Sequence, residues 1–599
     1  MRRLFLGIVA YQLVSGLAFW WLGDGGAGVQ AAVLVHVGLG LAAGALVGPY
    51  LRGHVPRVWK SPRVTMRLLG IGGAAGTVAA AGSGMWMAGT ALWGGWVGET
   101  LALVHRYAGM VAGTGLALHL ALAARRPAGR SAVAEALSGA GVGGAAAAVA
   151  VAALAIAAPA LTPLPRADRA GQALSTAGRF FDRPPPANRS CGTAGCHEQL
   201  YTEWREGPHG QADRDPYYRA LQSRLVGGKA APRIGLCLEC HDPSLLVTGQ
   251  FELGAVPVQT GEAVSCYACH AMARADGKRE RANYAVAPPP GGASEDSGLG
   301  RFLVRAWPAS HRRRYGRALY ERSALCSACH RATVNEEIPG FGTLRIENPF
   351  QRWELARVKP LCQDCHMGTR KSETYPSHRS HRFEASAVPP GVGPEQRSAV
   401  ERMLSGSSGV PDIRGGSSTD PLFALSAGGL SGTTGAGELH VTLTDLGRIG
   451  HQFPAGAVDL QRVWLEAQLT DPSGTELARW GEVEPGGALL PGTPVFRRPG
   501  AVATGEPEGS PFGWLRPEES VRLTLKLPAT FDRGRLVGSR LQGSLCYRKL
   551  HGAAITRLDP DGGGLGLPQR QVIGRLDEVL GRGRWKIEGG RRRGRDGGG

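Results

Sequence analysis

The chain has almost no cysteine left over for disulfide bonds. It contains 11 cysteines in 599 residues, and ten of them occur in close pairs whose second member is followed directly by histidine. Only Cys546 lies outside these pairs, in a segment with the alternation of a β-strand, where it is most simply a buried small apolar residue. The pattern excludes a disulfide-stapled fold and indicates another use of the thiols.

The chain also lacks the concentrated basic surface that is typical of nucleic-acid binding. Its net charge is +19, but many positive residues are spread over loops between hydrophobic segments, and others form the Arg591–Arg595 run before a terminal glycine run. We expect the tail, residues 589–599, to be disordered. The sequence therefore predicts no nucleic-acid partner, and its length predicts two to four domains.

The ten paired cysteines form five motifs between residues 191 and 366. Four motifs are C-x-x-C-H, and the first, CGTAGCH, has four residues between its cysteines. In such motifs each thiol adds across a haem vinyl group, and the histidine binds the iron from the proximal side. The cysteines are Cys191, Cys196, Cys237, Cys240, Cys266, Cys269, Cys326, Cys329, Cys362 and Cys365. The proximal histidines are His197, His241, His270, His330 and His366. One motif alone could be a zinc half-site, but five predict covalently bound c haems, which are attached outside the cytoplasm.

Residues 1–161 are predicted to form a transmembrane bundle of four or five helices. Apolar runs near the ~20 residues that a membrane crossing requires cover about 4–22, 29–51, 67–92, 101–124 and 139–161. The second to fifth runs are rich in Gly and Ala, which lets membrane helices approach closely. The first run could instead be a cleaved signal peptide, which would leave four helices in the same orientation.

Basic residues gather in the loops on one side of this bundle. They occur in residues 52–67 and 125–130, whereas the opposite loops hold Asp24 and Glu99 and no Lys or Arg. By the positive-inside rule, the N-terminus is cytoplasmic and the fifth helix leads into the periplasm. The expected location is the bacterial inner membrane, multi-pass, with the large C-terminal region in the periplasm, where haem c is attached.

Four histidines lie in or beside the bundle, where ionisable side chains are costly and indicate function. His105 and His119 are fourteen positions apart on one helix, hence about 40° apart around its axis and about 21 Å apart in height. His36 should lie near the level of His105, and His54, just past the end of helix two, near that of His119. The pairs His36–His105 and His54–His119 would hold one or two b haems, and interhelical hydrogen bonding is the alternative.

Two stretches in residues 30–125, VHVGLGLAAGALVGPYLRGH and VHRYAGMVAGTGLALHL, resemble the small cytochrome b membrane subunits that link quinones to extracytoplasmic redox enzymes. The resemblance implies the quinone pool as a partner. Quinol oxidation needs a proton acceptor, and Glu99, near the level of His105, is a candidate. The alternative is that Glu99 only complements the dipole of its helix.

Residues 162–189 are predicted to be a Pro-rich linker, and residues 190–414 a pentahaem c domain, mostly helical or irregular. This domain shows little regular hydrophobic periodicity, as expected where porphyrin forms the core. A distal histidine can close each iron, and the spare histidines occur in the settings WREGPHG (204–210), WPASH (307–311), SHRSHRF (377–383) and GHQFPAG (450–456).

Over about residues 188–470, these settings resemble periplasmic multihaem cytochromes related to the hydroxylamine-oxidoreductase group. The resemblance implies distal ligation by His209, His311, His381 and His451, with His378 as the fifth. The alternative for each is a surface histidine in a polar loop. The wide spacing in CGTAGCH departs from the family pattern and leaves the first haem the least specified.

Residues 415–588 are predicted to form an antiparallel β-sandwich. Segments such as ELHVTLTDL, RVWLEAQLTD and SVRLTLKLPA alternate apolar and polar residues, and DPSGTE at 471–476 predicts a hairpin turn. The resemblance to the sheet domain that follows GHxFPxG in the related cytochromes points to the same fold. This domain would supply His451 and act as a wall or docking surface.

The chain is thus predicted to be multidomain and to carry electrons between the quinone pool and periplasmic redox proteins through b and c haems. Quinol dehydrogenase activity is one hypothesis. A terminal reductase or oxidase of a small nitrogen or sulfur compound, with one open-site haem, is an alternative. A haem-bearing subunit of a larger respiratory complex is the third.

Overall fold

A computed structural model gives the arrangement of the chain. It describes residues 2–21, 27–95, 97–125, scattered positions from 130 to 145, 181, 184–193, 195–226, 234–251, 257, 259–275, 284–289, 295–332, 334–346, 348–356, 359–371, 377–384, 423–431, 437–457, 460–483, 489, 515, 519–562, 564–565 and 570–580. The predicted tail and most of the predicted fifth helix and linker lie outside these residues.

The chain forms two compact units, and each combines segments that are distant in sequence. The first, which we call the bundle unit, comprises Met1–Ala167, Phe181–Glu198 and Ala287–Arg317. The second, the sheet unit, comprises Asp168–Phe180, Gln199–Val286 and Ala318–Gly599. The first haem-attachment motif therefore belongs to the bundle unit, and the other four motifs belong to the sheet unit.

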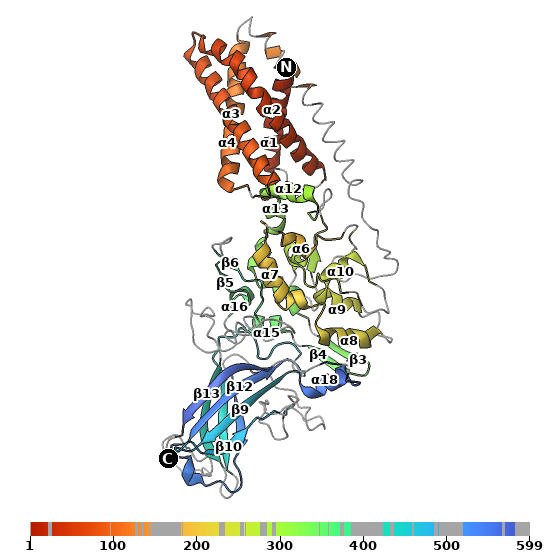
Figure 1. Cartoon of the computed structure of the whole chain (residues 1–599), viewed down its shortest axis with the longest axis vertical. Coiled ribbons are helices and arrows are strands. Elements are labelled where there is room, and N and C mark those ends of the chain that lie inside the picture. The colour runs from red at the N-terminus through yellow and green to blue at the C-terminus, as the bar shows by residue number, and fades with distance from the viewer. Residues whose placement is uncertain are drawn as a thin grey trace, which may run out of the picture. The chain divides into compact units, whose positions relative to one another are not determined.

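Four helices form the bundle: α1 (Arg2–Trp21), α2 (Ala27–Trp59), α3 (Val64–Leu92) and α4 (Glu99–Ala124) (Figure 1). The spans Gly28–Trp59, Val64–Leu92 and Glu99–Ala124 are each long and apolar enough to cross a membrane, and α1 holds a shorter apolar stretch, Phe5–Phe19. Glycine lets α3 and α4 pack closely, since a Cβ on Gly76 would lie 2.7 Å from the backbone nitrogen of Ala112.

Helix α2 is longer than its apolar run suggests. It continues through Pro49 and Pro56 to Trp59, so the predicted end of helix two near residue 51 is wrong, and His54 lies within the helix. A proline removes one backbone hydrogen bond, but membrane helices tolerate it because neighbouring groups satisfy the freed carbonyl.

The remainder of the bundle unit consists of three short helices, α6 (Asn188–Cys191), α12 (Gly298–Ala306) and α13 (Pro308–Tyr315). The Ser297 hydroxyl caps α12 by accepting from the Gly300 N–H. Helix α12 contacts α2 and α3, and Figure 1 shows it lying across one end of the bundle. Its Leu303 is buried with Val33 of α2 in one apolar cluster.

In the sheet unit, short helices and two-stranded hairpins surround the attachment motifs. The helices are α7 (Glu198–Glu206, whose first residue belongs to the bundle unit), η1 (His209–Gln211), α8 (Pro216–Val226), α9 (Ile234–His241), α10 (Pro243–Thr248), α11 (Cys266–His270), η3 (Ala318–Glu321), α14 (Ala324–His330), α15 (Pro349–Leu355) and α16 (Cys362–His366). The hairpins pair β1 (Met272–Ala275) with β2 (Tyr284–Val286), β3 (Val334–Ile338) with β4 (Gly342–Ile346), and β5 (Thr369–Arg370) with β6 (His378–Arg379).

Two antiparallel sheets form the C-terminal part of the sheet unit, as the alternation of the sequence predicts. One has the order β10-β9-β12-β13 and the other β11-β8-β7. Their strands are β7 (Phe423–Ser431), β8 (Glu438–Asp445), β9 (Arg462–Thr470), β10 (Glu476–Trp480), β11 (Ser520–Lys526), β12 (Arg540–Arg548) and β13 (Gln571–Val579), with η5 (Arg533–Leu536) and α18 (Gly552–Leu558) between them. Both sheets contribute to one core, in which Val441 of β8 and Leu465 of β9 are fully buried. Cys546 is a free, buried cysteine in β12.

Candidate haem sites

The four C-x-x-C-H motifs share one local structure. Each occupies a short helix that ends at the motif histidine: His241 ends α9, His270 ends α11, His330 ends α14 and His366 ends α16. Cysteines three positions apart lie on the same side of a helix, so both thiols face one direction and the imidazole follows at the helix end. None of the ten motif cysteines forms a disulfide bond, and all ten are partly exposed.

The first motif does not form a single helix like the other four. Helix α6 ends at Cys191, and the next residues turn back so that the His197 N–H donates to the Cys191 carbonyl at 2.9 Å. The Cys196 N–H donates to Thr193 at 2.8 Å, and Gly195 has φ +72°, which favours glycine. The two extra residues are thus taken up in a tight turn.

Four of the five proximal histidines face a second histidine from a distant segment. The ring centres are 6.2 Å apart for His197–His311, His209–His330 and His270–His381, and 6.3 Å apart for His366–His451. Imidazole nitrogens bind first-row metal ions at about 2.0 Å and lie about 1.2 Å from the ring centre, so two axial histidines on one iron require about 6.4 Å. The four separations fit a haem iron between each pair.

Backbone hydrogen bonds hold several of these rings by one nitrogen. Nδ1 of His366 donates to the Glu384 carbonyl at 2.6 Å, Nδ1 of His381 to the Arg379 carbonyl at 2.9 Å, and Nδ1 of His451 to the Gln452 carbonyl at 2.8 Å. Such outer contacts fix the tautomer and leave Nε2 as the metal-binding nitrogen.

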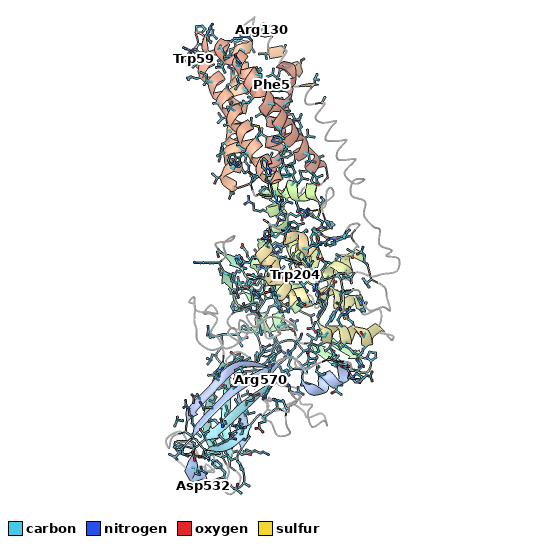
Figure 2. The ribbon with its side chains drawn as sticks, in the orientation of Figure 1. Phe5, Trp59, Arg130, Trp204, Asp532 and Arg570 are labelled. Atoms are coloured by element: carbon cyan, nitrogen blue, oxygen red, sulfur yellow. The ribbon has the colours of Figure 1, made fainter. Side chains whose placement is uncertain are left out.

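Burial keeps several of these imidazoles neutral, which is the form that binds a metal. It lowers the pKa of His209 to about 3 and the pKa values of His330, His381 and His451 to about 4. The loop that carries His209 is clamped, because Trp204 donates to the Val264 carbonyl at 2.8 Å and the Val264 N–H donates to the His209 carbonyl at 3.2 Å. Figure 2 labels this tryptophan within the sheet unit.

The fifth proximal histidine, His241, has a different environment. Its Nδ1 donates to the Ala212 carbonyl at 3.1 Å, and Tyr218 stacks on its ring at 3.9 Å with planes 5° apart. Among the residues that the structure describes, no histidine faces His241 at the separation of the other four pairs.

His378, expected on the distal side of the fifth haem, lies elsewhere. Its Nε2 is 3.2 Å from the Glu203 carboxylate, and both side chains are buried. Burial alone would raise the pKa of Glu203, but hydrogen bonds from the His381 N–H and from His378 outweigh it and lower the pKa. This contact engages Nε2 of His378, and a ligand role for His378 stays a prediction.

The bundle brings its own four histidines together in two pairs. Ring centres are 6.2 Å apart for His36–His105 and 5.9 Å apart for His54–His119. Nδ1 of His36 lies 2.7 Å from the Ser15 hydroxyl, and Nδ1 of His105 donates to the Ala80 carbonyl at 3.0 Å. Because both contacts engage Nδ1, Nε2 of each ring is the nitrogen that faces the partner ring.

A cavity adjoins the second bundle pair. Its volume is about 510 Å³, which is within the usual range for cofactor sites, about 300–1,000 Å³. His54 and His119 line it together with Tyr50, Arg57 and Phe5, the last of which Figure 2 labels. The donor set and the space both fit a non-covalent haem, and Arg57 supplies a cation for a propionate.

Glycines of α3 make room for the α4 histidines. A Cβ on Gly84 would lie 3.0 Å from Cε1 of His105, and one on Gly70 would lie 3.2 Å from Cε1 of His119. These two glycines are fourteen residues apart, as are the two histidines they face. Glu99, the candidate proton acceptor, is the exposed first residue of α4, and its role stays a prediction.

Sequence reasoning missed three contributors to these sites: Tyr218 against His241, Glu203 against His378, and the Phe19–Trp307 contact in the bundle unit, whose ring centres are 5.4 Å apart. The sequence has a weak signal for the last, since Trp307 precedes His311 by one helical turn. The sequence offered no local signal for the other two.

Two comparisons with known proteins find similar proteins. Residues 190–271 match the family described as cytochrome c554 and c-prime. The crystal structure of a penta-haem cytochrome c552 from Thermochromatium tepidum is similar with a TM-score of 0.39 and 17% identity, over 66% of this chain and 98% of that chain. No curated protein matches the chain.

The family match covers the first three attachment motifs and the His209 loop, which lies between the first and the second. The C-x-x-C-H helices would supply the covalent attachment of haem, and the facing histidines would supply the axial ligands. The chain is a multihaem c-type cytochrome.

Proposed function

We propose that this cytochrome transfers electrons between the membrane quinone pool and periplasmic redox proteins, as an inner-membrane protein whose attachment motifs lie in the periplasm. The observation that carries the proposal is one spacing found in two environments. Four histidine pairs outside the bundle and two pairs inside it all have ring centres 5.9–6.3 Å apart. A single chain thus offers pairs of axial ligands to haem irons within the membrane bundle and to haem irons in the periplasm.

In this proposal the facing histidines would hold each iron and close it to other ligands. Bound haem supplies one-electron chemistry between Fe(II) and Fe(III), with potentials set by axial ligand, burial and hydrogen bonding. The attachment motifs of the sheet unit lie close to one another, because the thiols of Cys326 and Cys362 are within hydrogen-bond reach, as are those of Cys329 and Cys240. Tyr284, fully buried, donates to the Glu239 carbonyl at 2.6 Å beside these motifs.

The two C-terminal sheets have a defined place in this proposal. They form a β-sandwich whose β8–β9 connection carries His451 to face His366. A rigid sheet scaffold fixes the distal ligand of the last attached haem, and the outer faces of the sandwich serve as the docking surface for a periplasmic partner.

Quinol oxidation at the bundle requires a proton acceptor as well as an electron acceptor. Glu99 at the start of α4 is the proposed acceptor, and the b haems held by His36–His105 and His54–His119 receive the electrons. Flow in the opposite direction, toward quinone, uses the same residues.

The test is haem analysis combined with reduction by duroquinol of the purified, detergent-solubilised protein. We expect five c haems and two b haems per chain from the pyridine haemochrome, and reduction of both haem types by the quinol. A protein without haem b, or one whose haem b stays oxidised with quinol, would refute the quinone link. Replacing Glu99 with Gln should slow quinol oxidation and leave reduction by dithionite unchanged.

A second function is favoured by one observation, the absence of a facing histidine at His241 in the described part of the chain. An iron with only this proximal ligand has an open position for a small nitrogen or sulfur compound. Carbon monoxide binding to the reduced protein distinguishes the two functions: one haem per chain that binds CO supports an open catalytic site, and none supports pure electron transfer. Purification together with companion proteins would support the third alternative, a subunit of a respiratory complex.

A further inference from the structure

The bundle unit contains a complete haem c site as well as the helices. His197 and the first motif come from Phe181–Glu198, and His311 comes from Ala287–Arg317, and both segments belong to this unit. The first c haem site is therefore built on the bundle, whereas the other four attachment motifs belong to the sheet unit.

Apolar packing joins this site to the end of the bundle. Leu303 of α12 is 7% exposed and packs with Val33 of α2, which is 5% exposed, and Phe19, Phe302 and Trp307 complete the cluster. Removal of this apolar surface from water stabilises the contact. The packing holds α12, and the α13 helix that follows it, against α2.

Polar and backbone contacts fix the first motif to the loop between α3 and α4. A Cβ on Gly195 would lie 3.1 Å from the Gly94 carbonyl oxygen, so the two backbones touch. The Arg305 side chain reaches both Gly94 and the Cys196 thiol. The wide spacing of CGTAGCH thus produces the turn that meets the bundle.

A line of aromatic rings connects the two histidine pairs of this unit. The Phe19 ring centre is 5.4 Å from that of His36 and 5.4 Å from that of Trp307. Trp307 is the N-cap residue of α13, and His311 follows one turn later on the same helix. The sequence of contacts runs His36, Phe19, Trp307, α13, His311.

We propose that Phe19 and Trp307 form an electron bridge between the haem held by His36 and His105 and the first c haem. The inference rests on the proposed function. In the step, one electron leaves a ferrous haem held by His36 and His105, which becomes ferric. It enters the ferric haem held by His197 and His311, which becomes ferrous, and no proton or covalent bond changes.

The test compares Trp307→Leu and Trp307→Phe with Leu299→Ala, a control at an exposed position of α12, the helix that ends just before Trp307. Duroquinol is mixed with the oxidised protein, and the α-bands of haem b and haem c are followed separately. We expect haem b to be reduced at the wild-type rate in all variants. Reduction of haem c should slow by at least an order of magnitude in Trp307→Leu, less in Trp307→Phe, and not at all in Leu299→Ala.

A second measurement removes the dependence on quinol. Protein reduced by dithionite is mixed with ferricyanide, which is too polar to enter the bundle, so haem b can lose its electron only through the c haems. Oxidation of haem b should lag in Trp307→Leu and in a Cys191→Ser/Cys196→Ser variant that lacks the first haem. Wild-type rates of haem b oxidation in both variants would overturn the bridge, whereas failure of duroquinol to reduce haem b would overturn only the quinone link.

A purely structural role for Trp307 has a different signature. It would reduce the haem c content below five or convert the first haem to high spin, because His311 would move. Full haem c content with unchanged low-spin resonances, together with slow transfer, identifies the bridge. Loss of haem or of the low-spin signal in Trp307→Phe as well as in Trp307→Leu would contradict it.

Discussion

His378 and Glu203 form a buried pair in which the imidazole Nε2 lies 3.2 Å from the carboxylate oxygen. Three residues further along, His381 instead faces His270 at 6.2 Å, and its own N–H donates to the other oxygen of Glu203 at 2.9 Å. One carboxylate thus contacts the loop at two points, and the two histidines of SHRSH have different neighbours.

This division predicts opposite results at two neighbouring positions. His381→Ala should convert one haem from low spin to high spin, because the iron loses its distal ligand. His378→Gln keeps a hydrogen-bonding side chain and should leave every haem spin state unchanged. Electron paramagnetic resonance of the oxidised variants distinguishes the two positions, and a new high-spin signal in His378→Gln alone would reverse the assignment.

The ring planes predict two kinds of low-spin signal. In the bundle the planes are 84° apart for His36–His105 and 68° apart for His54–His119, whereas His366–His451 and His270–His381 are 9° and 16° apart. Crossed imidazoles leave two iron d orbitals nearly equal in energy, and parallel ones separate them. We expect strongly anisotropic low-spin resonances from haem b and rhombic ones from these c haems, and rhombic signals alone would contradict the crossed pairs.

Glycine at the α3–α4 contact should control haem b content. Gly84→Val places methyl groups where the His105 ring lies, and overpacking of this kind costs about 1–3 kcal/mol. Gly82, two residues earlier, has open space around its Cβ direction, so Gly82→Val is a matched control. The ratio of haem b to haem c should fall by about half in Gly84→Val only, because one of two b sites is lost, and equal ratios in both variants would argue against the site.

A partly buried ion pair should make the stability of the sheet unit pH-dependent. The Lys549 ammonium lies 2.7 Å from Asp215, which also accepts from the N–H groups of Tyr217 and Tyr218 at the start of α8. Burial alone would raise the pKa of Asp215, but these partners outweigh it and lower the pKa below its usual value. A lowered carboxyl pKa stabilises the fold above the unfolded value of about 3.9, and this is lost as the pH falls through the folded value.

Asp215→Asn should therefore lower the melting temperature at neutral pH, with about 1 kcal/mol lost from the helix cap and more from the ion pair. The difference from wild type should shrink below pH 4. Asp561→Asn, at an exposed position, serves as the control. Thermal unfolding followed by far-ultraviolet circular dichroism in detergent measures both, and a constant difference at all pH values would contradict the ion pair.

Much of the site could be predicted because its chemistry lies in short motifs. The C-x-x-C-H pattern marks attachment, and His209, His311, His381 and His451 stand in recognisable settings that the structure brings opposite proximal histidines. Which pairs form could not be predicted, because each joins distant segments. The role of His378 depends on Glu203, which only tertiary packing places beside it.

The fold, like the site, could be predicted from the sequence only where the signal is local. Strands β8, β9 and β11 follow the alternation of apolar residues, and helices α3 and α4 follow the apolar runs. Helix α2 passes through Pro49, where a local rule predicts an end, and membrane helices in general tolerate proline where neighbouring groups satisfy the freed carbonyl. The membership of residues 181–198 and 287–317 in the bundle unit has no local signature, since it arises from contacts of α12 with α2 and α3.

The packing of α12 against the bundle limits which fragments of the protein can be prepared for biochemical experiments. A soluble fragment that begins after the helices would retain all five motifs but would expose Phe302, Leu303 and Trp307 to water, and apolar patches of this kind favour aggregation. A membrane fragment ending before residue 287 would keep His197 and lose His311. Neither fragment would keep the packing and the histidine pair of the intact protein, so experiments should start from the entire chain.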